Sequence, residues 1–321
     1  REAAGWYPVV VPNPDRRVLH VITDLDVGGA ERSLMSIALA TRQRSWVPIV
    51  ASLMPGGLLA GRLRKANIPV RQLGMKRSRH ALFGLLRLAA MIRRERPAVI
   101  QGWMYHADLM ATLALALSGR WSKTKLFWGV RCSDMDFSKY DLQLRLVVRL
   151  CALLSRLPHG VIANSDAGRE VHRRLGYRPK RFCVVHNGIE TDRFKVPQGT
   201  RAQVRRELGL PPNALVIATV ARLDPMKDYE CFLAALERLP GIDALAIGRG
   251  TENLPDRPKL RRLGQREDIV ELLAASDILV SSSAFGEGFS NAIAEGMAAG
   301  LAVVATDIGD ARHVVGDAGI I

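Results

Sequence analysis

Short runs of β-branched and other apolar residues alternate along the chain with longer stretches in which apolar positions recur every three or four residues. The short runs are typical of buried parallel strands, and the longer stretches of helices that cover them. In the first half the pattern predicts strands at RVLHVIT, VPIVAS, PVRQLG, AVIQG, LFWGV and GVIANS. It predicts helices between them, among them 31–41, 82–94 and 141–156.

The second half repeats the pattern, with strands predicted at LVIATVA, ALAIG, DILVSS and AVVAT. We therefore predict an α/β protein of two doubly wound, parallel-sheet domains, residues 1–188 and 189–321. The stretch HNGIETDRF joins a strand to a Pro- and Gly-containing segment and is the predicted hinge. Ligands of open parallel sheets lie beyond the carboxyl ends of the strands, so we expect a ligand cleft between the two domains.

Charge is distributed unevenly over the two halves. The net charge is +15, with 31 Lys and Arg against 13 Asp and Glu in residues 1–190, and 15 against 18 in residues 191–321. A basic first domain attracts nucleic acid, an anionic membrane surface or an anionic substrate, and the sign alone does not choose between them.

Cysteine usage and apolar run lengths narrow the class of protein further. The four cysteines have no paired spacing, so no zinc site or disulfide framework is predicted, and a reducing cytoplasm fits best. No apolar run approaches the roughly 20 residues that span a bilayer. The chain begins at Arg1 without the order of a signal peptide, and we expect its native N-terminus to be missing.

Two loops at predicted strand ends carry candidate phosphate chemistry. Gly28 and Gly29 in DLDVGGAERS precede a predicted helix, where glycines allow close approach of a ligand and leave helix N–H groups for an anion. The pattern is not G-x-G-x-x-G, which disfavours a nicotinamide dinucleotide site, and a plain tight turn is the alternative. In VARLDPMKD, Arg222 and Lys227 suit a diphosphate whose negative charge grows as its bond to a sugar breaks, although surface cations often have no specific role.

The stretch FGEGFSNAIAEGMAAG places one glutamate in a glycine-bearing loop and another in a helix. Ser290 is the predicted N-cap, and the helix is expected to end near Gly300. The N–H groups near Phe289, Ser290 and Asn291 are then able to hold a phosphate, with Glu287 before the helix and Glu295 in its second turn. A carboxylate accepts hydrogen bonds from neighbouring hydroxyls, which suits Glu295 to a ribose and Glu287 to a hexose. The alternative is that Glu287 is a solvated loop charge and Glu295 pairs with a cation.

At these residues the chain resembles glycosyltransferase family 4, a retaining family with the GT-B architecture of two facing Rossmann-like domains. The motifs that carry the resemblance occur in order along almost the whole chain: GGAER, ANSDAGREVHRRLG, VVHNGIETDRF, VARLDPMKD and EGFSNAIAE. Each motif alone is weak evidence for the family, but five of them in order at the expected strand ends are specific evidence for it.

The resemblance implies a role for each candidate residue. Arg222 and Lys227 would neutralise the donor diphosphate without a metal ion, and Glu295 would hold the ribose. Glu287 would contact the transferred sugar, as an electrostatic stabiliser in preference to a nucleophile. The remaining donor-side residues it implies are Gly29, Phe289, Ser290 and Asn291, and, for the base, Gly264, Gln265 and Arg266.

On the acceptor side the resemblance implies Gly28, His106 and Arg131. His106 lies at a strand end where the family often has a catalytic or acceptor-side histidine, although a structural role is equally expected. Arg131 follows LFWGV, where many members have a His-Gly pair, and either binds an acceptor phosphate or pairs with an acid such as Asp134.

Two further departures from the family pattern stand out. Between AIGRGTEN and RRLGQRED the chain is too short for the helix and strand that members carry, and its prolines argue against a long helix. The chain also stops at Ile321, where relatives continue through further helices, so we expect the second domain to be incomplete.

The predicted function is transfer of a hexose or N-acetylhexosamine from a nucleotide diphosphate sugar, UDP preferred, to a hydroxyl of a lipid-linked glycan or polysaccharide precursor. No cofactor is expected beyond the nucleotide sugar. We expect a cytoplasmic enzyme, peripheral on the inner membrane, with the basic segment KRSRHALFGLLRLAAMIRRERP as the candidate membrane surface. An ordinary amphipathic helix is the alternative for that segment.

Three alternative functions remain open from the sequence. They are a GT-B sugar-nucleotide epimerase, a non-catalytic partner subunit, and a basic nucleic-acid-binding protein. The last has no recognised motif beside its charge.

Overall fold

The chain folds into two compact units, each built on a parallel sheet, in a computed structural model that describes residues 16–26, 28–75, 81–133 and 141–321. The first unit holds residues 1–131, 137–163 and 169–185, and the second holds residues 132–136, 164–168 and 186–321. The prediction of an α/β protein with two doubly wound parallel sheets is confirmed. The domain boundary and the cleft between the domains stay predictions.

The first unit contains a sheet of seven strands in the order β3-β2-β1-β4-β5-β6-β7, every pair parallel. Its six predicted strands are confirmed, and the seventh lies just before the predicted hinge. The strands are β1 Arg17–Ile22, β2 Val47–Ser52, β3 Val70–Gln72, β4 Val99–Trp103, β5 Lys125–Val130, β6 Gly160–Ala163 and β7 Phe182–Val184.

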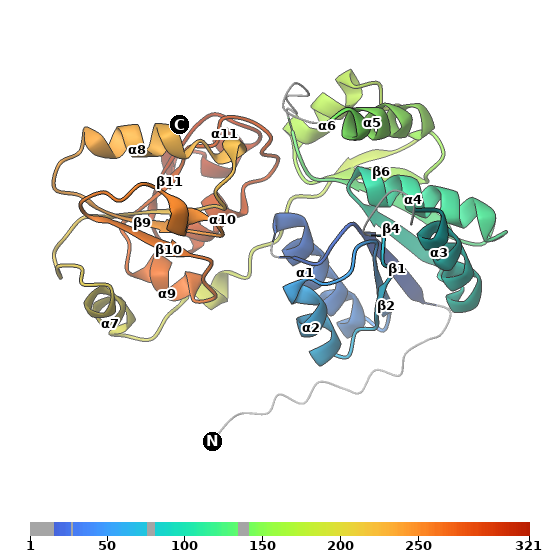
Figure 1. Cartoon of the computed structure of the whole chain (residues 1–321), viewed down its shortest axis with the longest axis horizontal. Coiled ribbons are helices and arrows are strands. Elements are labelled where there is room, and N and C mark those ends of the chain that lie inside the picture. Colours follow the sequence, from blue (N-terminus) through green and yellow to red (C-terminus); the bar gives the residue numbers. More distant parts are fainter. Residues whose placement is uncertain (1–15, 27, 76–80, 134–140) are drawn as a thin grey trace. The chain divides into compact units, whose positions relative to one another are not determined.

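Helices cover both faces of this sheet. The strand order reverses direction between β3 and β4, and right-handed crossovers then put the helices before and after the reversal on opposite faces. Accordingly α1 and α2 lie against one face and α3 and α4 against the other (Figure 1). The helices are α1 Gly29–Gln43, α2 Leu58–Lys65, α3 Ala81–Glu95, α4 Tyr105–Leu117, α5 Leu142–Leu154 and α6 Asp166–Arg174.

Alternation along the strands builds the core under α1 and α2. Successive side chains of a strand point to opposite faces, so Ile22 of β1, Val50 of β2 and Trp103 of β4 share one face. All three are buried with Leu34 of α1 and Leu63 of α2 in one apolar cluster. None of the helices in the part of the chain that the structure describes is long and apolar enough to cross a bilayer.

The second unit contains a sheet of six strands in the order β10-β9-β8-β11-β12-β13, again with every pair parallel. The strands are β8 Val216–Val220, β9 Asp243–Ile247, β10 Leu260–Gly264, β11 Ile278–Ser281, β12 Ala302–Ala305 and β13 Gly319–Ile320. Strand β10 was not among the predicted strands: it begins at Leu260, runs through the RRLG of RRLGQRED, and pairs with β9. Only the 3₁₀ turn Thr251–Asn253 precedes β10, so the absence of a long helix in this segment is confirmed.

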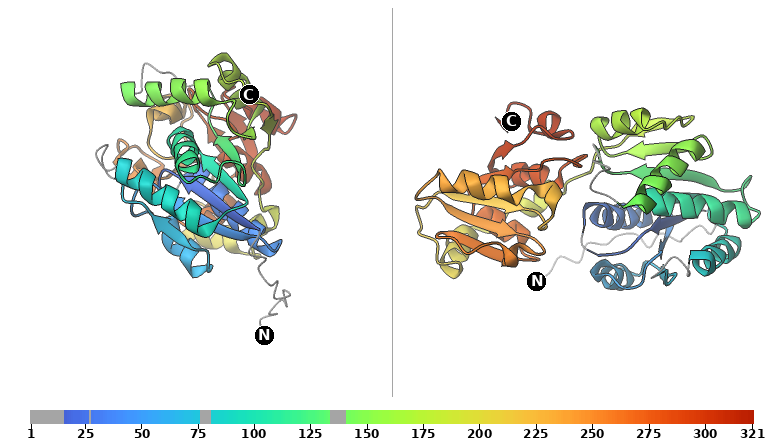
Figure 2. Two further views of the ribbon diagram at one scale, coloured as in Figure 1. Left: turned by 90° about the vertical axis from the view of Figure 1, so that its right-hand side faces the viewer. Right: turned by 45° about the horizontal axis from the view of Figure 1, so that its top comes forward.

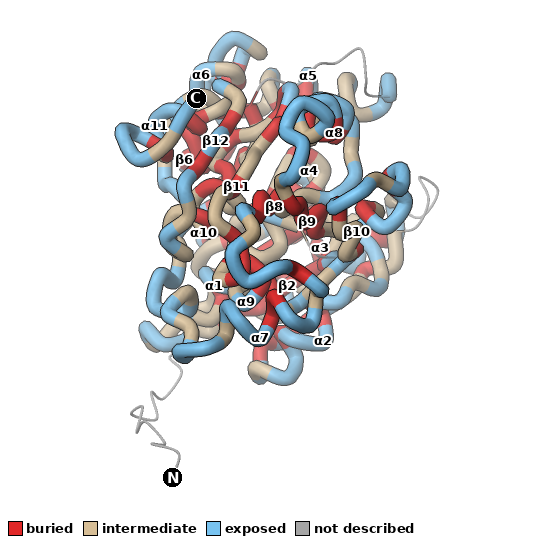
Figure 3. Tube along the Cα trace, turned by 90° about the vertical axis from the view of Figure 1, so that its left-hand side faces the viewer, coloured by how far each residue is buried: buried red, intermediate tan, exposed pale blue. Residues whose placement is uncertain are grey.

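Helices lie on both sides of this sheet too, as the yellow-to-red part of Figure 2 shows. They are α7 Thr200–Glu207, α8 Tyr229–Glu237, α9 Ile269–Ala274, α10 Asn291–Ala298 and α11 Ala311–Val315. Leu245 and Ile247 of β9 pack in the cluster with α7, α9 and α10, while Ala244 and Ala246 pack in the cluster with α8. Strand β9 is buried along its whole length, and it is red in Figure 3.

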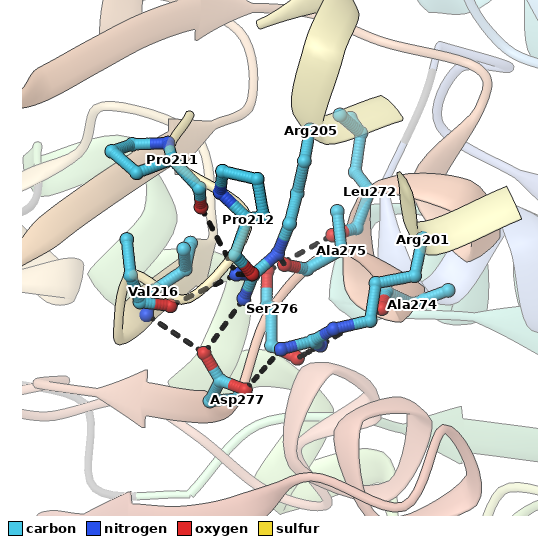
Figure 4. A network of polar contacts seen from close by, with 11 residues as sticks. Arg201, Arg205, Pro211, Pro212, Val216, Leu272, Ala274, Ala275, Ser276 and Asp277 are labelled. Carbon is cyan, nitrogen blue, oxygen red and sulfur yellow. Dashed lines mark hydrogen bonds and ion pairs between the residues drawn. The ribbon is translucent and has the colours of Figure 1, made fainter. Parts of the chain in front are cut away.

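A buried arginine ties α7 to the sheet of the second unit (Figure 4). Arg205 is 2% exposed, and its guanidinium donates hydrogen bonds to the Asp277 carboxylate at 2.9 Å and to the carbonyl oxygens of Ala275, Pro211, Pro212 and Ala214. Asp277 also accepts from the N–H of Val216 and from Arg201. Burial raises the pKa of Asp277, but these hydrogen bonds outweigh it and lower the pKa below its usual range. The network therefore satisfies a buried cation completely.

Candidate functional site

The loops after β8 and β11 lie side by side because these strands are neighbours in the second sheet. The loop after β8 forms the 3₁₀ turn Pro225–Lys227. Two hydrogen bonds join it to the loop after β11: Ser282 Oγ donates to the Lys227 carbonyl at 2.9 Å, and the Ala284 N–H donates to the Met226 carbonyl at 2.9 Å. The two predicted donor-binding loops therefore form one surface.

Lys227 and Glu287 form an ion pair on this surface. Their side chains are 17% and 13% exposed, so Glu287 is not the solvated loop charge of the alternative interpretation. Ser283 Oγ donates a second hydrogen bond to the same carboxylate at 3.1 Å. Burial lowers the pKa of Lys227 to about 8, and the charge of Arg222 acts in the same direction, while Asp224 opposes it. A further anion near Lys227 would stabilise its charged form.

Arg222 is held in place by Asp224, a residue of the same loop. Arg222 Nε donates to Asp224 Oδ2 at 2.9 Å, and Asp224 Oδ1 accepts from the Met226 N–H at 3.0 Å. Burial raises the pKa of Asp224, but these two hydrogen bonds more than offset it and keep the carboxyl ionised. The side chain of Arg222 is 44% exposed and so is accessible to a ligand.

Close backbone approaches fix the loop that carries Glu287. A Cβ on Gly288 would lie 2.6 Å from Oδ1 of Asn164, so any other residue there would require that side chain to move. Gly309 has φ +64, and a Cβ there would collide with the carbonyl oxygens of Glu287 and Gly288. Gly288 and Gly309 thus allow the Glu287 loop to pack closely, and Ser133 Oγ donates to the Glu287 carbonyl.

Helix α10 begins where the sequence predicts, but without the expected cap. Ser290 occupies the N-cap position and its side chain makes no capping hydrogen bond. Asn291 accepts a hydrogen bond from Asn187 Nδ2 at 2.8 Å, and the Phe289 ring lies 5.8 Å from the ring of His186. Both partners belong to the predicted hinge segment HNGIETDRF. Glu295 lies in the second turn of α10, as predicted, and its side chain is partly exposed.

The stretch predicted to take the base lies at the end of β10. Gly264 donates its N–H to Thr251 Oγ1 at 3.0 Å, and its carbonyl accepts from the Gly248 N–H. The Arg266 guanidinium donates to both oxygens of Asp268, at 2.7 and 2.5 Å. Gly264 therefore uses both its N–H and its carbonyl within the unit, and base binding by this stretch stays a prediction.

The acceptor-side candidates all lie in the first unit, at or beside carboxyl ends of its strands. Gly28 precedes α1, and His106 is the second residue of α4. Burial lowers the pKa of His106, which therefore favours its neutral form at pH 7, and Asp141 opposes this shift. Arg131 follows β5 with its guanidinium carbon 4.2 Å from the centre of the Trp103 ring. Its other predicted partner, Asp134, lies outside the described residues.

Ser283 and Asp224 also belong to the candidate site, although they were not predicted from the sequence. Asp224 could have been predicted, because Asp followed by Pro favours a capped turn, and the Asp224 carboxylate caps the 3₁₀ turn Pro225–Lys227. Ser283 carries no such signal, since only the folding of its loop brings it to Glu287.

Asp166, His186 and Asp310 also come together in the second unit, with one ligand atom from each lying within 4.8 Å of the others. The Asp310 carboxylate already accepts from the N–H groups of Asp166 and Ala167 and lies 3.3 Å from His186 Nε2. The Asp310 carboxylate is thus already used by backbone N–H groups of its own unit, and we assign no metal to the group.

Comparison with known proteins places these loops in a family. Residues 27–193 match the model of Glycosyltransferase Family 4, and residues 214–321 match that of Glycosyl transferases group 1. A D-inositol 3-phosphate glycosyltransferase of Mycobacterium tuberculosis is 30% identical over 173 residues, which make up 49% of this chain and 35% of that protein. The match thus spans about a third of the length of the curated relative.

Solved structures agree on the fold. Anabaena HepE in complex with UDP and glucose superposes with a TM-score of 0.81 at 24% identity, over 93% of this chain and 82% of that one. A glycosyltransferase from Rickettsia africae gives 0.75 at 21% identity, over 94% and 82%. The two sheets are thus the two Rossmann-like domains of a GT-B fold, as predicted. Since the first family model alone matches more than half of its residues, this chain belongs to glycosyltransferase family 4.

Proposed function

We propose that this protein is a retaining, metal-independent glycosyltransferase that moves a hexose or N-acetylhexosamine from a UDP-sugar to an acceptor hydroxyl. The observation that carries the proposal is the ion pair of Lys227 with Glu287, two groups predicted to bind neighbouring parts of one donor. A partly buried cation and carboxylate in contact, beside the oriented Arg222, match a diphosphate linked to a polyhydroxylated sugar.

In the proposed mechanism the diphosphate lies against Arg222 and Lys227, with the N–H groups at the start of α10 as further donors. Negative charge grows on the diphosphate as the glycosidic bond breaks, and fixed cations stabilise it most at that moment. Lys227 exchanges Glu287 for the diphosphate, and the Glu287 carboxylate then accepts from the sugar hydroxyls. It thereby stabilises the oxocarbenium-like sugar electrostatically.

Retention is proposed to follow a front-face route. The departing phosphate oxygen accepts the proton of the acceptor hydroxyl on the side from which the bond to the sugar breaks. The acceptor oxygen forms its bond on that same face, so the anomeric configuration is kept. Glu295 holds the ribose diol, and the backbone of Gln265 and Arg266 contacts the base.

Two relatives support the choice of substrates. The HepE structure contains UDP and glucose, which favours a UDP-sugar as donor here. The mycobacterial relatives are D-inositol 3-phosphate glycosyltransferases, which supports sugar transfer as the reaction here. For this chain we propose a lipid-linked glycan or polysaccharide precursor as acceptor.

A donor screen tests the proposal. Ligand-detected NMR would compare UDP, GDP and their glucose and N-acetylglucosamine derivatives, followed by product analysis with lipid-linked and soluble acceptors. We expect UDP to bind, the product to keep the donor's anomeric configuration, and EDTA to leave the rate unchanged. An inverted product, or an EDTA-sensitive rate, would contradict the mechanism.

The same screen separates the alternatives. Donor consumed without any acceptor would point to the sugar-nucleotide epimerase. Salt-sensitive binding of an oligonucleotide, with no response to nucleotides, would point to nucleic acid. UDP binding without turnover on any acceptor would favour a non-catalytic subunit.

Membrane association is part of the proposal, because two helices of the first unit carry apolar side chains on their outer faces. Helix α3 buries Leu88 and Ile92 but exposes Leu82, Phe83 and Leu86 by 63%, 66% and 52%. This exposure favours a membrane surface over the alternative of an ordinary amphipathic helix with its apolar side in the core. Arg93, Arg94 and Arg96 follow, whereas Lys76, Arg77 and Arg79 of the predicted surface lie outside the described residues.

Helix α5 carries a similar stripe of exposed leucines. They recur on one face as Leu142, Leu146, Leu150 and Leu153, with Arg145 and Arg149 between them. Each cation near an anionic lipid surface contributes about 1 kcal/mol, so the basic first half favours such a surface. Sedimentation with vesicles of neutral or anionic lipid tests this: we expect binding only to the anionic ones, and less of it after Leu82→Ser with Phe83→Ser. Equal binding to both kinds of vesicle would contradict the charge argument.

A further inference from the structure

The two oxygens of the Glu287 carboxylate are used unequally. Its two hydrogen-bond donors, Lys227 Nζ and Ser283 Oγ, both donate to the same oxygen, Oε1. The other oxygen, Oε2, accepts no hydrogen bond within the part of the chain that the structure describes. An ionised carboxylate accepts at both oxygens, so Oε2 is the one left to receive a hydrogen bond from a ligand.

Ser283 is held in the second unit as a fixed donor. The residue is 2% exposed and lies just after β11. Its carbonyl accepts from Thr306 Oγ1 at 2.5 Å, and the Thr306 N–H donates to the Ser281 carbonyl at 3.0 Å. Thr306 directly follows β12, the neighbour of β11 in the sheet, so two adjacent strands hold the backbone of Ser283. A buried hydroxyl needs an acceptor, and Ser283 Oγ uses Glu287 Oε1, at 3.1 Å.

The two donors to Oε1 differ in how far they can move. Lys227 belongs to the loop after β8 and carries its charge at the end of a flexible four-carbon stem. In the proposed mechanism it leaves Glu287 for the diphosphate. The Ser283 hydroxyl stands on a single side-chain carbon of a fixed backbone, so it cannot follow. Once Lys227 has left, the hydrogen bond from Ser283 is the contact that still holds Oε1.

The orientation of a carboxylate matters for the binding of a sugar. A carboxylate held at one oxygen offers the other oxygen at a defined place. A carboxylate without such a contact turns about its last bond, and ordering it on binding costs conformational entropy. A sugar hydroxyl that donates to Glu287 therefore binds more tightly when Ser283 already holds the carboxylate.

We propose that Ser283 is a positioning residue for Glu287: its hydroxyl keeps Oε1 in place, so that Oε2 accepts the hydrogen bond of a hydroxyl on the donor sugar. Ser283 acts through Glu287 and contacts neither the sugar nor the diphosphate. The inference rests on the proposed function, because that proposal assigns the sugar to Glu287. Its consequence is that Ser283 supports the affinity for the sugar of the donor and not the affinity for the UDP part.

Comparison of UDP with UDP-sugars separates these two parts of the donor. Isothermal titration would measure the dissociation constants of UDP, UDP-glucose and UDP-N-acetylglucosamine for the parent and for Ser283→Ala. The sugar advantage is the dissociation constant of UDP divided by that of the tighter UDP-sugar. We expect Ser283→Ala to bind UDP as the parent does and to lower the sugar advantage about three- to tenfold, because one hydrogen bond to the carboxylate is lost.

Further variants show whether the serine acts through Glu287. Ser283→Thr keeps the hydroxyl and should retain most of the sugar advantage. In a Glu287→Ala background, Ser283→Ala should have no further effect, because the group that the serine positions is gone. The matched control is Ser276→Ala, which should leave all three affinities unchanged. Ser276 is equally buried, donates to the Leu272 carbonyl at 2.9 Å and precedes the opposite end of β11.

Several results would overturn the inference. They are an unchanged sugar advantage in Ser283→Ala, equal losses of UDP and UDP-sugar affinity, which a purely structural role predicts, and the same loss with and without Glu287. A parent that binds neither UDP-sugar more tightly than UDP would also overturn it, since Oε2 then gains nothing from the sugar. If Ser283→Ala does not fold, Ser283→Cys, which keeps the size and weakens the donor, gives the same comparison. Failure of the proposed function is recognised separately, because the parent then does not bind UDP itself.

Discussion

Two variants that break the ion pair between Lys227 and Glu287 should differ in their effect on the affinity for UDP. Lys227→Met keeps the apolar stem and removes the charge, while Glu287→Gln keeps the shape and removes the opposite charge. Both side chains are more than four-fifths buried. Two unit charges at about 4 Å attract by about 4 kcal/mol at an effective dielectric constant of about 20, and desolvation offsets part of this.

For stability, the two variants should behave alike. Each leaves one partly buried charge without its partner, so each should lower the free energy of unfolding of the second unit by about 2–3 kcal/mol. The double variant should lose less than the sum, because the two residues are in contact. The matched control is Arg312→Met, which breaks the exposed pair with Asp307 and should change stability by less than about 1 kcal/mol.

For UDP binding, the two variants should differ in sign. Lys227→Met removes a charge-assisted contact to the diphosphate of about 1.5–3 kcal/mol, so the affinity should fall by about 10- to 100-fold. Glu287→Gln removes the group that competes for Lys227, so the affinity for UDP should hold or rise. Isothermal titration with UDP, beside urea unfolding of the same samples, measures both effects. Unchanged UDP affinity in Lys227→Met, or an equal loss in the two variants, would refute the exchange of Glu287 for the diphosphate.

The other predictions concern three residues of the second unit. The pKa of Lys227 is lowered to about 8, and a bound diphosphate must raise this pKa, because the anion stabilises the charged amine. The affinity for UDP should therefore be full below pH 8 and fall as the pH rises above 8. Titrations with UDP across pH 7–10 check this, and Lys227→Arg should show a flat profile. Arg205→Met should lower the free energy of unfolding by about 3–5 kcal/mol, because it removes the guanidinium that donates to Asp277 and to four carbonyls. The variant that still folds should bind UDP normally, as urea unfolding and UDP titration would show. Glu295→Gln should weaken UDP binding about tenfold but leave the binding of 2′-deoxy-UDP nearly unchanged, since the lost contact is to the ribose diol; an equal loss for both ligands would show that Glu295 acts elsewhere.

Buried strands could be predicted from the sequence because a strand with both faces covered needs apolar residues throughout. VPIVAS gave β2 with its observed bounds, Val47–Ser52. Strand β10 was not predicted, because it lies at the edge of its sheet and its sequence, LRRLG, contains two arginines. Arg261 there donates to the Asp243 carboxylate, and Arg262 donates to the Leu254 carbonyl. An edge strand can therefore satisfy arginines that a central strand could not bury.

The individual residues of the candidate site could be predicted from the sequence, but the contacts between them could not. Lys227 and Glu287 were each placed at a strand end from local patterns, yet they lie 60 residues apart in sequence. Their meeting depends on β8 and β11 being neighbours, with no other strand between them, and on Gly309 allowing the Glu287 loop to pass. Strand order is set by packing over the whole unit, so no local pattern contains it. The stacking of Arg131 on Trp103 is hidden for the same reason.

The ion pair of Lys227 with Glu287 solves an electrostatic problem of the proposed donor site. Lys227 stands at the carboxyl edge of the second sheet, partly removed from water, and would be costly to leave without a counter-charge. Glu287 supplies that charge. In the proposed mechanism this carboxylate orients the cation before the diphosphate arrives and gives way when it does. Affinity for the diphosphate is then lower than the cation alone would provide, and the difference is the free energy of the internal pair. Titration of inorganic pyrophosphate into the parent and into Glu287→Gln measures this difference, and weaker binding by the variant would contradict the competition.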